Sequence, residues 1–305
     1  MSSSYRQRLG NDEWGSLSVA GTSTARCVSI AVVVIAIAIP ARGQIAPECA
    51  GVQKPADYDE AKQQAFLANY FAASFLLTPL RGPPNEPGRA RVGLEVGVIP
   101  PLSCEDRLAL DATKTEETNK SPVLPRPRLQ LTANRLGPVI PWAGLSLVPP
   151  VPTPLGTVLL IGGELGATWP IEVTTELTID IGGRAHLGVA RVRSDIATAP
   201  AGTPAVDDVF FTSSLGADAS VGARFALHPS VAVTPSLFAG VADVSTLVIV
   251  GDDLAVVQNT QYPWAGALVG GGAEMTLWGW LVVGVEVSSA VPVFSTAKAF
   301  IGAQL

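Results

Sequence analysis

The 305-residue sequence predicts an all-β fold: an antiparallel up-and-down β-barrel of about ten strands (roughly eight to twelve) preceded by an N-terminal α-helix. Three observations predict it. The chain is 48% hydrophobic and only 15% charged, yet no unbroken apolar run approaches the roughly 20 residues of a membrane-spanning helix. From residue 90 onward, apolar residues recur with period two. The connections between these segments alternate between long and short.

Residues 209–227 show the period-two pattern best. Odd positions from Val209 to Leu227 are mostly apolar, whereas even positions such as Ser214 and Asp218 are small or polar. Strands of soluble proteins average about five or six residues, so such long segments favour transmembrane strands with their apolar face in lipid. The pattern recurs, in places more weakly, at 90–99, 128–136, 141–149, 157–169, 175–189, 231–249, 263–278, 281–287 and 297–305.

The connections and the aromatic residues follow the same layout. Long or polar connections fall at 100–127, 150–156, 194–207 and 250–261, and short turns at 137–138, 169–174, 228–230 and 278–280. Aromatic residues at the short-turn ends are Trp142, Trp169, Trp278 and Trp280, and those at the long-loop ends include Phe211 and Trp264. Two such rows are typical of the aromatic girdles at the two membrane interfaces.

On this layout, residues 90–305 resemble bacterial outer-membrane β-barrels, whose long loops face outward and whose short turns face the periplasm. The resemblance implies a porin-like protein of the Gram-negative outer membrane, in contact with outer-membrane lipid and assembled by the barrel-insertion machinery. One departure is the last residue, Leu305, because such barrels commonly end in an aromatic residue.

The N-terminal part has the order of an export signal. Residues 1–26 are polar with three arginines, residues 28–39 form a 12-residue apolar run, and Ala41 and Gly43 are placed like a cleavage site before Gln44. We therefore expect a signal peptide at 1–43, an extension at 44–89 and the barrel at 90–305. The alternative, an N-terminal membrane anchor, needs a longer apolar run.

A helix is predicted in the extension at residues 58–77, with Asp57 as its N-cap and Glu60 at the capping-box position. About 20 residues at 1.5 Å each span roughly 30 Å, the thickness of a bilayer core. Most strand glycines fall on the predicted lumen face, which favours a lumen filled by this helix. The alternative is a helix lying at the membrane interface.

The cysteines bear on the same prediction. Cys49 precedes the helix, and Cys104 follows the first strand on the loop side, so a disulfide between them would send the helix back through the lumen. The alternative is two unpaired thiols.

The lumen face is also predicted to carry charges. Acids and bases are nearly balanced, so mutual pairing is expected; an open lumen would weakly favour cations. The predicted lumen-facing residues are Arg91, Glu95, Arg128, Glu164, Glu176, Asp180, Arg184, His186, Asp218, Arg224, Glu274, Glu286 and Lys298.

Composition and motifs then narrow the function. With 20 basic and 26 acidic residues the chain offers no basic face for nucleic acid, and we expect no cofactor and no metal site. His186 with Asp180 or Ser214 could be drawn as a hydrolytic set, but no spacing requires it. We expect a non-enzymatic barrel, either a narrow or gated passage for small molecules or a structural surface protein. The alternatives are a secreted β-sandwich binding or adhesion module and a barrel-embedded hydrolase.

Overall fold

The computed structural model describes residues 49, 51–53, 55–59, 61–62, 66, 69, 76, 86–98, 103–106, 108–109, 114–115, 124–153, 156–194, 208–250, 255–258, 264–291 and 294–305. The predicted signal peptide, 1–43, lies outside these residues. In this part of the chain no helix is long and apolar enough to cross a membrane.

The predicted helix at 58–77 lies mostly outside the described residues, so its role as a plug stays a prediction. Ala61, Lys62, Phe66 and Asn69 are helical. The backbone N–H of Lys62 donates to Asp59 Oδ1 at 3.2 Å, so Asp59 acts as the N-cap in place of the predicted Asp57.

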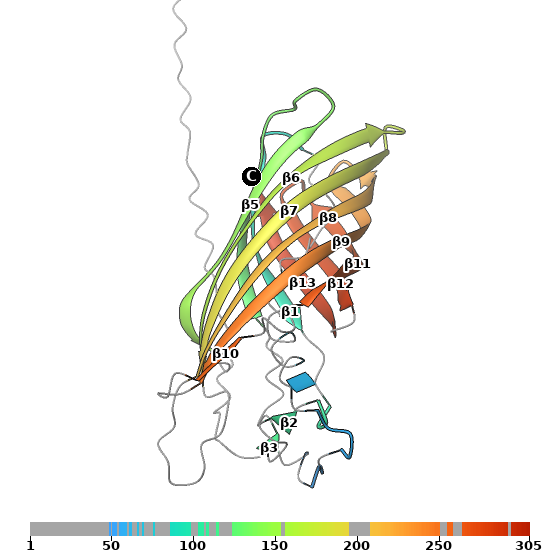
Figure 1. Cartoon of the computed structure of the whole chain (residues 1–305). Helices are drawn as coiled ribbons and strands as arrows, with labels where there is room; N and C mark the ends of the chain where they lie inside the picture. The colour runs from blue at the N-terminus through green and yellow to red at the C-terminus, as the bar shows by residue number, and fades with distance from the viewer. Residues whose placement is uncertain are drawn as a thin grey trace, which may run out of the picture. The chain divides into compact units, whose positions relative to one another are not determined.

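Ten antiparallel strands form a closed ring (Figure 1). In ring order they are β1 (Ala90–Val98), β4 (Leu124–Thr132), β5 (Ile140–Thr153), β6 (Gly156–Glu172), β7 (Leu177–Ser194), β8 (Asp208–His228), β9 (Val231–Val250), β11 (Trp264–Leu277), β12 (Leu281–Val291) and β13 (Phe294–Gln304). The short strand β10 (Ala255–Gln258) pairs antiparallel with the last residues of β9, and β2 (Leu108–Ala109) pairs with β3 (Lys114–Thr115) in a separate sheet.

The barrel closes where its first and last strands meet. β1 pairs with β13 from Arg91 opposite Gln304 to Val98 opposite Ala297. Beyond this ladder, Ala90 and Leu305 exchange two backbone hydrogen bonds of 3.2 and 2.8 Å. Each of the ten ring strands therefore pairs with a neighbour on both sides, so the β-sandwich alternative is wrong.

Every end of the observed strands lies within five residues of the predicted one, and β4 is displaced as a whole, because it begins and ends four residues earlier than predicted. The added residues include Pro125 and Pro127, although proline cannot donate to a ladder. In β4 the backbone N–H groups of even-numbered residues point toward β1, as Thr132 N–H does when it donates to the Arg89 carbonyl. The backbone nitrogens of the two prolines, which are odd-numbered, therefore point toward β5. β5 pairs with β4 only from Arg128 onward, so neither proline breaks a ladder bond.

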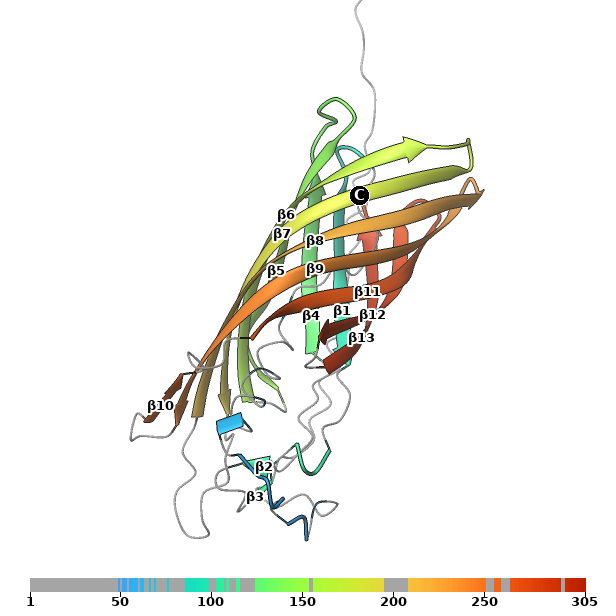
Figure 2. The same cartoon turned by 45° about the vertical axis from the view of Figure 1, so that its right-hand side comes forward.

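The two ends of the barrel differ. At the turn end, β4–β5, β6–β7, β8–β9 and β11–β12 are joined by short turns, at 133–139, 173–176, 229–230 and 278–280. The last turn has positive φ at Trp278 (53°) and Gly279 (73°). The opposite end, which we call the loop end, carries the long connections from β1 to β4, from β7 to β8 and from β9 to β11. At the same end β5–β6 and β12–β13 are joined across only two residues each, 154–155 and 292–293, so the long connection predicted at 150–156 is wrong. The strands are also unequal: β8 has 21 residues against nine in β1, and Figure 2 shows β6 to β9 running well past the others.

The outer and inner faces have opposite chemistry. Along β6 and β7 the outward residues Leu165, Ile181 and Leu187 are exposed, whereas the inward Glu164 and Arg184 are buried. A closed antiparallel barrel with an apolar outside, a polar inside and short turns at one end has the architecture of outer-membrane β-barrels.

Most of the predicted aromatic positions face outward. Trp169, Trp278 and Trp280 are 49%, 65% and 51% exposed at the turn end. Phe211 lies beneath the Arg191 guanidinium, 5.7 Å from the ring centre. Of Trp264 the structure describes the backbone but not the side chain.

Trp142 departs from the prediction, because its side chain is only 8% exposed and lies inside the barrel. It shares the inward parity of Gly144 on β5. On the neighbouring strand Gly166 leaves the space that the indole ring fills, since a Cβ at that position would overlap the ring.

Candidate functional site

A belt of alternating charges crosses the lumen, built entirely from inward-facing residues of the barrel wall. It passes from β12 through β13, β1, β4, β6 and β7 to β8, and each of its side chains is between 1% and 8% exposed. We call this set the charge belt; its members are Glu286, Lys298, Glu95, Arg126, Arg128, Glu164, Arg184 and Asp218.

The tightest contacts centre on Glu164. Arg128 donates to Glu164 Oε1 at 2.6 Å, and Arg184 donates to Glu164 Oε2 at 2.5 Å. Arg184 also donates through two nitrogens to Asp218 Oδ2, at 2.9 and 2.7 Å. One carboxylate therefore holds two guanidinium groups, and its loss would leave both buried cations short of a partner.

On the other side, Glu95 serves three cations. Arg128 lies 3.0 Å from its carboxylate, and Arg126 and Lys298 each lie 3.8 Å away. Lys298 also reaches Glu286 at 3.8 Å. The belt thus sets four carboxylates against four cations. Its neutrality explains how so many charges can be buried.

Glycines on neighbouring strands make room for these side chains. β5 lies between β4 and β6, and it places Ser146 opposite Arg128 and Gly144 opposite Glu164. A Cβ on Gly144 would overlap the Glu164 carboxylate, and one on Gly216 would overlap the His186 ring. The sequence interpretation took the inward glycines as space for a helix; at these positions they admit large side chains of the wall itself.

A second set of contacts lies at the turn end and includes a residue of the N-terminal extension. Arg91 donates to Gln304 Oε1 at 2.7 Å and lies 3.4 Å from Glu274. Glu86 accepts from Arg224 at 2.9 Å and from Gln304 at 2.5 Å. Glu86 therefore ties the extension to β8 and β13 just before β1 begins.

Leu76 of the extension lies inside the barrel, next to the charge belt. Its side chain is 3% exposed, and its carbonyl oxygen accepts from Arg126 Nη1 at 3.3 Å. The belt thus touches the extension directly, and Leu76 and Glu86, ten positions apart in the sequence, both contact the inner wall.

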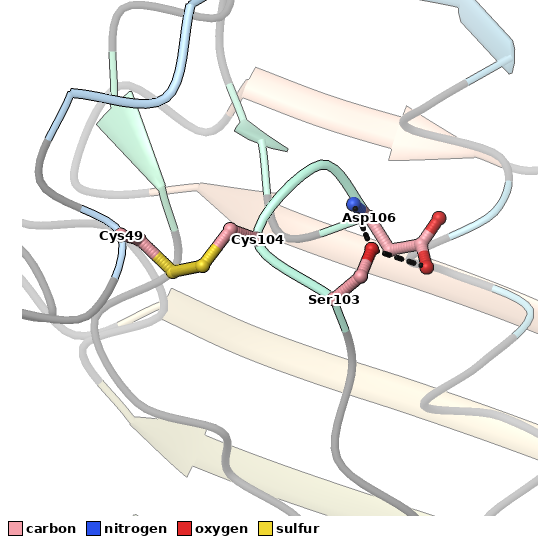
Figure 3. Close-up of a disulfide and its surroundings, with 4 residues drawn as sticks. All are labelled: Cys49, Ser103, Cys104 and Asp106. Carbon is pink, nitrogen blue, oxygen red and sulfur yellow. Dashed lines mark hydrogen bonds between the residues drawn. A yellow bond between two sulfur atoms is a disulfide. The ribbon is translucent and has the colours of Figure 1, made fainter.

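The third fixed point of the extension is a disulfide between Cys49 and Cys104, with Cα atoms 5.4 Å apart (Figure 3). Cys104 lies in the connection from β1 to β4, at the loop end. Beside it, Ser103 and Asp106 hydrogen-bond to each other. The extension is thus attached at the loop end through Cys49, inside the lumen through Leu76, and at the turn end through Glu86.

Two predicted lumen charges lie elsewhere or only partly inside. Glu176 is exposed, because β7 begins only at Leu177 and Glu176 belongs to the turn at 173–176. The Arg224 side chain is 31% exposed at the turn end, where it binds Glu86. The other predicted positions are buried: Arg91, Glu95, Arg128, Glu164, Asp180, Arg184, His186, Asp218, Glu274, Glu286 and Lys298.

Sequence reasoning missed Arg126 and Glu86. Arg126 has the same parity as Arg128, but it lies in the segment 100–127 that was predicted to be a long connection. Glu86 lies between the predicted helix and the first strand, in a Pro/Gly-rich segment with no periodicity, so no sequence signal marked it.

The histidine of the hydrolytic alternative has a different neighbour from the one drawn. His186 Nε2 lies 3.6 Å from Asp218 Oδ2, and Asp218 was not part of that set. Neither ring nitrogen has a hydrogen-bond partner within the described residues. In the same part of the chain no cluster of three or more His, Cys, Asp or Glu residues could hold a metal ion.

Comparisons with known proteins give only distant similarities. No family model and no curated protein matches the chain. The KdgM porin in complex with disordered oligogalacturonate is 9% identical with a TM-score of 0.31, covering 71% of this chain and 97% of its own. Ail, the attachment invasion locus protein of Yersinia pestis, is 11% identical with a TM-score of 0.29, covering 72% and 100%. The Pseudomonas putida toluene transporter TodX is 12% identical with a TM-score of 0.30, covering 78% and 71%. Similarity at this level carries no argument about ligand or activity.

Proposed function

We propose that this protein is a non-enzymatic β-barrel of the bacterial outer membrane that forms a gated passage for small molecules, with the charge belt as the gate. The exposed apolar outer face supports placement in lipid. The signal peptide at 1–43 and the barrel-insertion machinery would deliver it there.

The observation that carries the proposal is the burial of eight paired charges across the lumen. A barrel that is closed only for structural reasons would be at least as stable with apolar side chains, because desolvating ion pairs is costly. A belt whose carboxylates are shared between several cations can instead exchange partners with water or with a passing solute. Charged rings of this kind set selectivity in known pores.

Planar-bilayer recording of the full-length protein tests the proposal. Glu164→Gln removes one acid from the belt, and we expect more frequent openings than in the wild type. Glu176→Gln makes the same chemical change in the exposed turn and should leave the recording unchanged. A shift in gel mobility on boiling first establishes that each variant forms a barrel. If folded wild type and Glu164→Gln are equally silent, the passage is refuted and a structural surface role is favoured.

A further inference from the structure

Toward the loop end the inner wall carries a cluster of buried apolar side chains, in contrast to the charge belt; the buried hydroxyl residues Ser146, Thr212, Ser214, Thr246 and Ser288 are interspersed among them. We call the apolar residues the apolar lumen cluster. On the wall they come from β5 to β12, and they are Val148, Val158, Leu160, Ala190, Val192, Phe210, Phe238, Ala242, Val244, Leu268 and Ala290; Leu76 of the extension belongs to the same cluster.

Position along the strands separates most of the cluster from the belt. On β6, Leu160 lies four residues nearer the loop end than Glu164, and on β7, Ala190 lies six residues nearer than Arg184. Phe238 is the exception, because on β9 it lies two residues nearer the turn end than Gly240, which pairs with Asp218. Leu160 and Ala190 face inward, because each is about 1% exposed while its outward neighbours, such as Ile161 and Val189, are exposed. The cluster is therefore a feature of the inner wall and not of the lipid-facing surface.

Such a lining is unusual for a membrane barrel, whose interior is normally polar. If the lumen at this level held only water, each of these side chains would be hydrated at a cost proportional to its apolar area. An apolar group in contact with this part of the wall would remove that cost. In this structure one occupant is the Leu76 side chain, a four-carbon aliphatic group supplied by the chain itself.

We infer that the apolar lumen cluster is a binding site for an uncharged apolar small molecule, an aliphatic chain or an aromatic ring, that takes the place of Leu76. This inference rests on the proposed function in one respect, since it names the class of solute that would enter the passage. Displacing Leu76 also removes its carbonyl from Arg126, so binding is coupled to a cation of the belt.

The competition between solute and Leu76 has a measurable size. Burial of one leucine side chain changes an equilibrium constant by a factor of about 10 to 150. A solute must overcome that factor to bind in the wild type. Truncation of Leu76 to alanine should therefore increase apparent affinity by about tenfold or more.

Photolabelling in lipid vesicles with an octyl diazirine, mapped by mass spectrometry, tests the inference. Adjacent residues of β6 provide an internal control, because Leu160 faces the cluster and Ile161 faces lipid. We expect labelling of Leu160 that excess octane abolishes, and labelling of Ile161 that octane leaves largely unchanged. Labelling confined to outward residues would overturn the inference.

A pair of variants on β7 sharpens the test. Ala190→Phe fills the cluster and should reduce the competable labelling of Leu160 at least about tenfold, because a phenyl group occupies the site. Ala185→Phe adds the same group on the lipid face and should not change it. Equal labelling in both variants would contradict a site at the cluster. Conductance without inward labelling would leave the passage intact and refute only the apolar site, whereas inward labelling without conductance would refute the passage alone.

Discussion

The charge belt and the apolar lumen cluster are closed in different ways. The belt consists of wall residues that hold one another, from Glu286 on β12 to Asp218 on β8. The cluster combines wall residues with Leu76, which belongs to the N-terminal extension. All the ion pairs of the belt are therefore made within the barrel wall, while the cluster includes a separate segment. Opening of the proposed passage would involve withdrawal of Leu76 and re-pairing of the belt, and the hydrogen bond from Arg126 to the Leu76 carbonyl couples the two events.

Loss of the central belt carboxylate, Glu164, should reduce the stability of the barrel more than any other change considered. Glu164→Ala leaves Arg128 and Arg184 short of a partner in a buried site, and we expect a loss of about 3–5 kcal/mol in the free energy of unfolding. Urea unfolding in lipid vesicles, followed by tryptophan fluorescence, measures it. Glu176→Ala, in an exposed turn, is the matched control. A loss no larger than the control's would mean that the belt does not hold itself together.

The cluster should be less sensitive, because its residues interact through packing alone. Leu160→Ala removes a buried aliphatic side chain, and we expect a loss of about 2–4 kcal/mol in the same unfolding experiment. Leu165→Ala, on the same strand but 69% exposed toward the outside, should cost distinctly less. Equal losses at the two positions would indicate that the inner wall is not packed at this level.

The smallest effect is expected where a glycine admits a belt side chain. Gly144→Ala places a methyl group against the Glu164 carboxylate, and we expect a cost of about 1–3 kcal/mol as that carboxylate shifts. Gly163→Ala, whose added methyl meets nothing within 4 Å, is the control for the change itself. If Gly144→Ala proves as stable as Gly163→Ala, the belt tolerates movement of its central residue.

Much of the barrel could be predicted from the sequence because period-two alternation records which side of a strand faces lipid. The alternation identified the long strands and also most of the inward charges, with Arg126 missed and Glu176 wrongly placed inside. It failed at β4, whose first four residues were predicted to belong to the long connection at 100–127. It also failed to place Trp142, whose proximity to a turn suggested an interfacial position although its parity points inward.

Other features depend on contacts that no local pattern encodes. Glu86 binds Arg224 and Gln304, residues more than 130 positions away in the sequence. The belt itself arises from side chains on seven strands, whose levels relative to one another are fixed by register and not by composition. Sequence reasoning could therefore list charges that face inward, but not which carboxylate holds which cation.

The reversal potential under a salt gradient tests most directly whether ions pass through the charge belt. Glu164→Gln leaves four cations facing three carboxylates, and Lys298→Gln leaves the reverse. The account predicts that the first variant shifts selectivity toward anions and the second toward cations, relative to the wild type. Identical reversal potentials in the two folded, conducting variants would contradict it, because the conducting path would then not run past the belt.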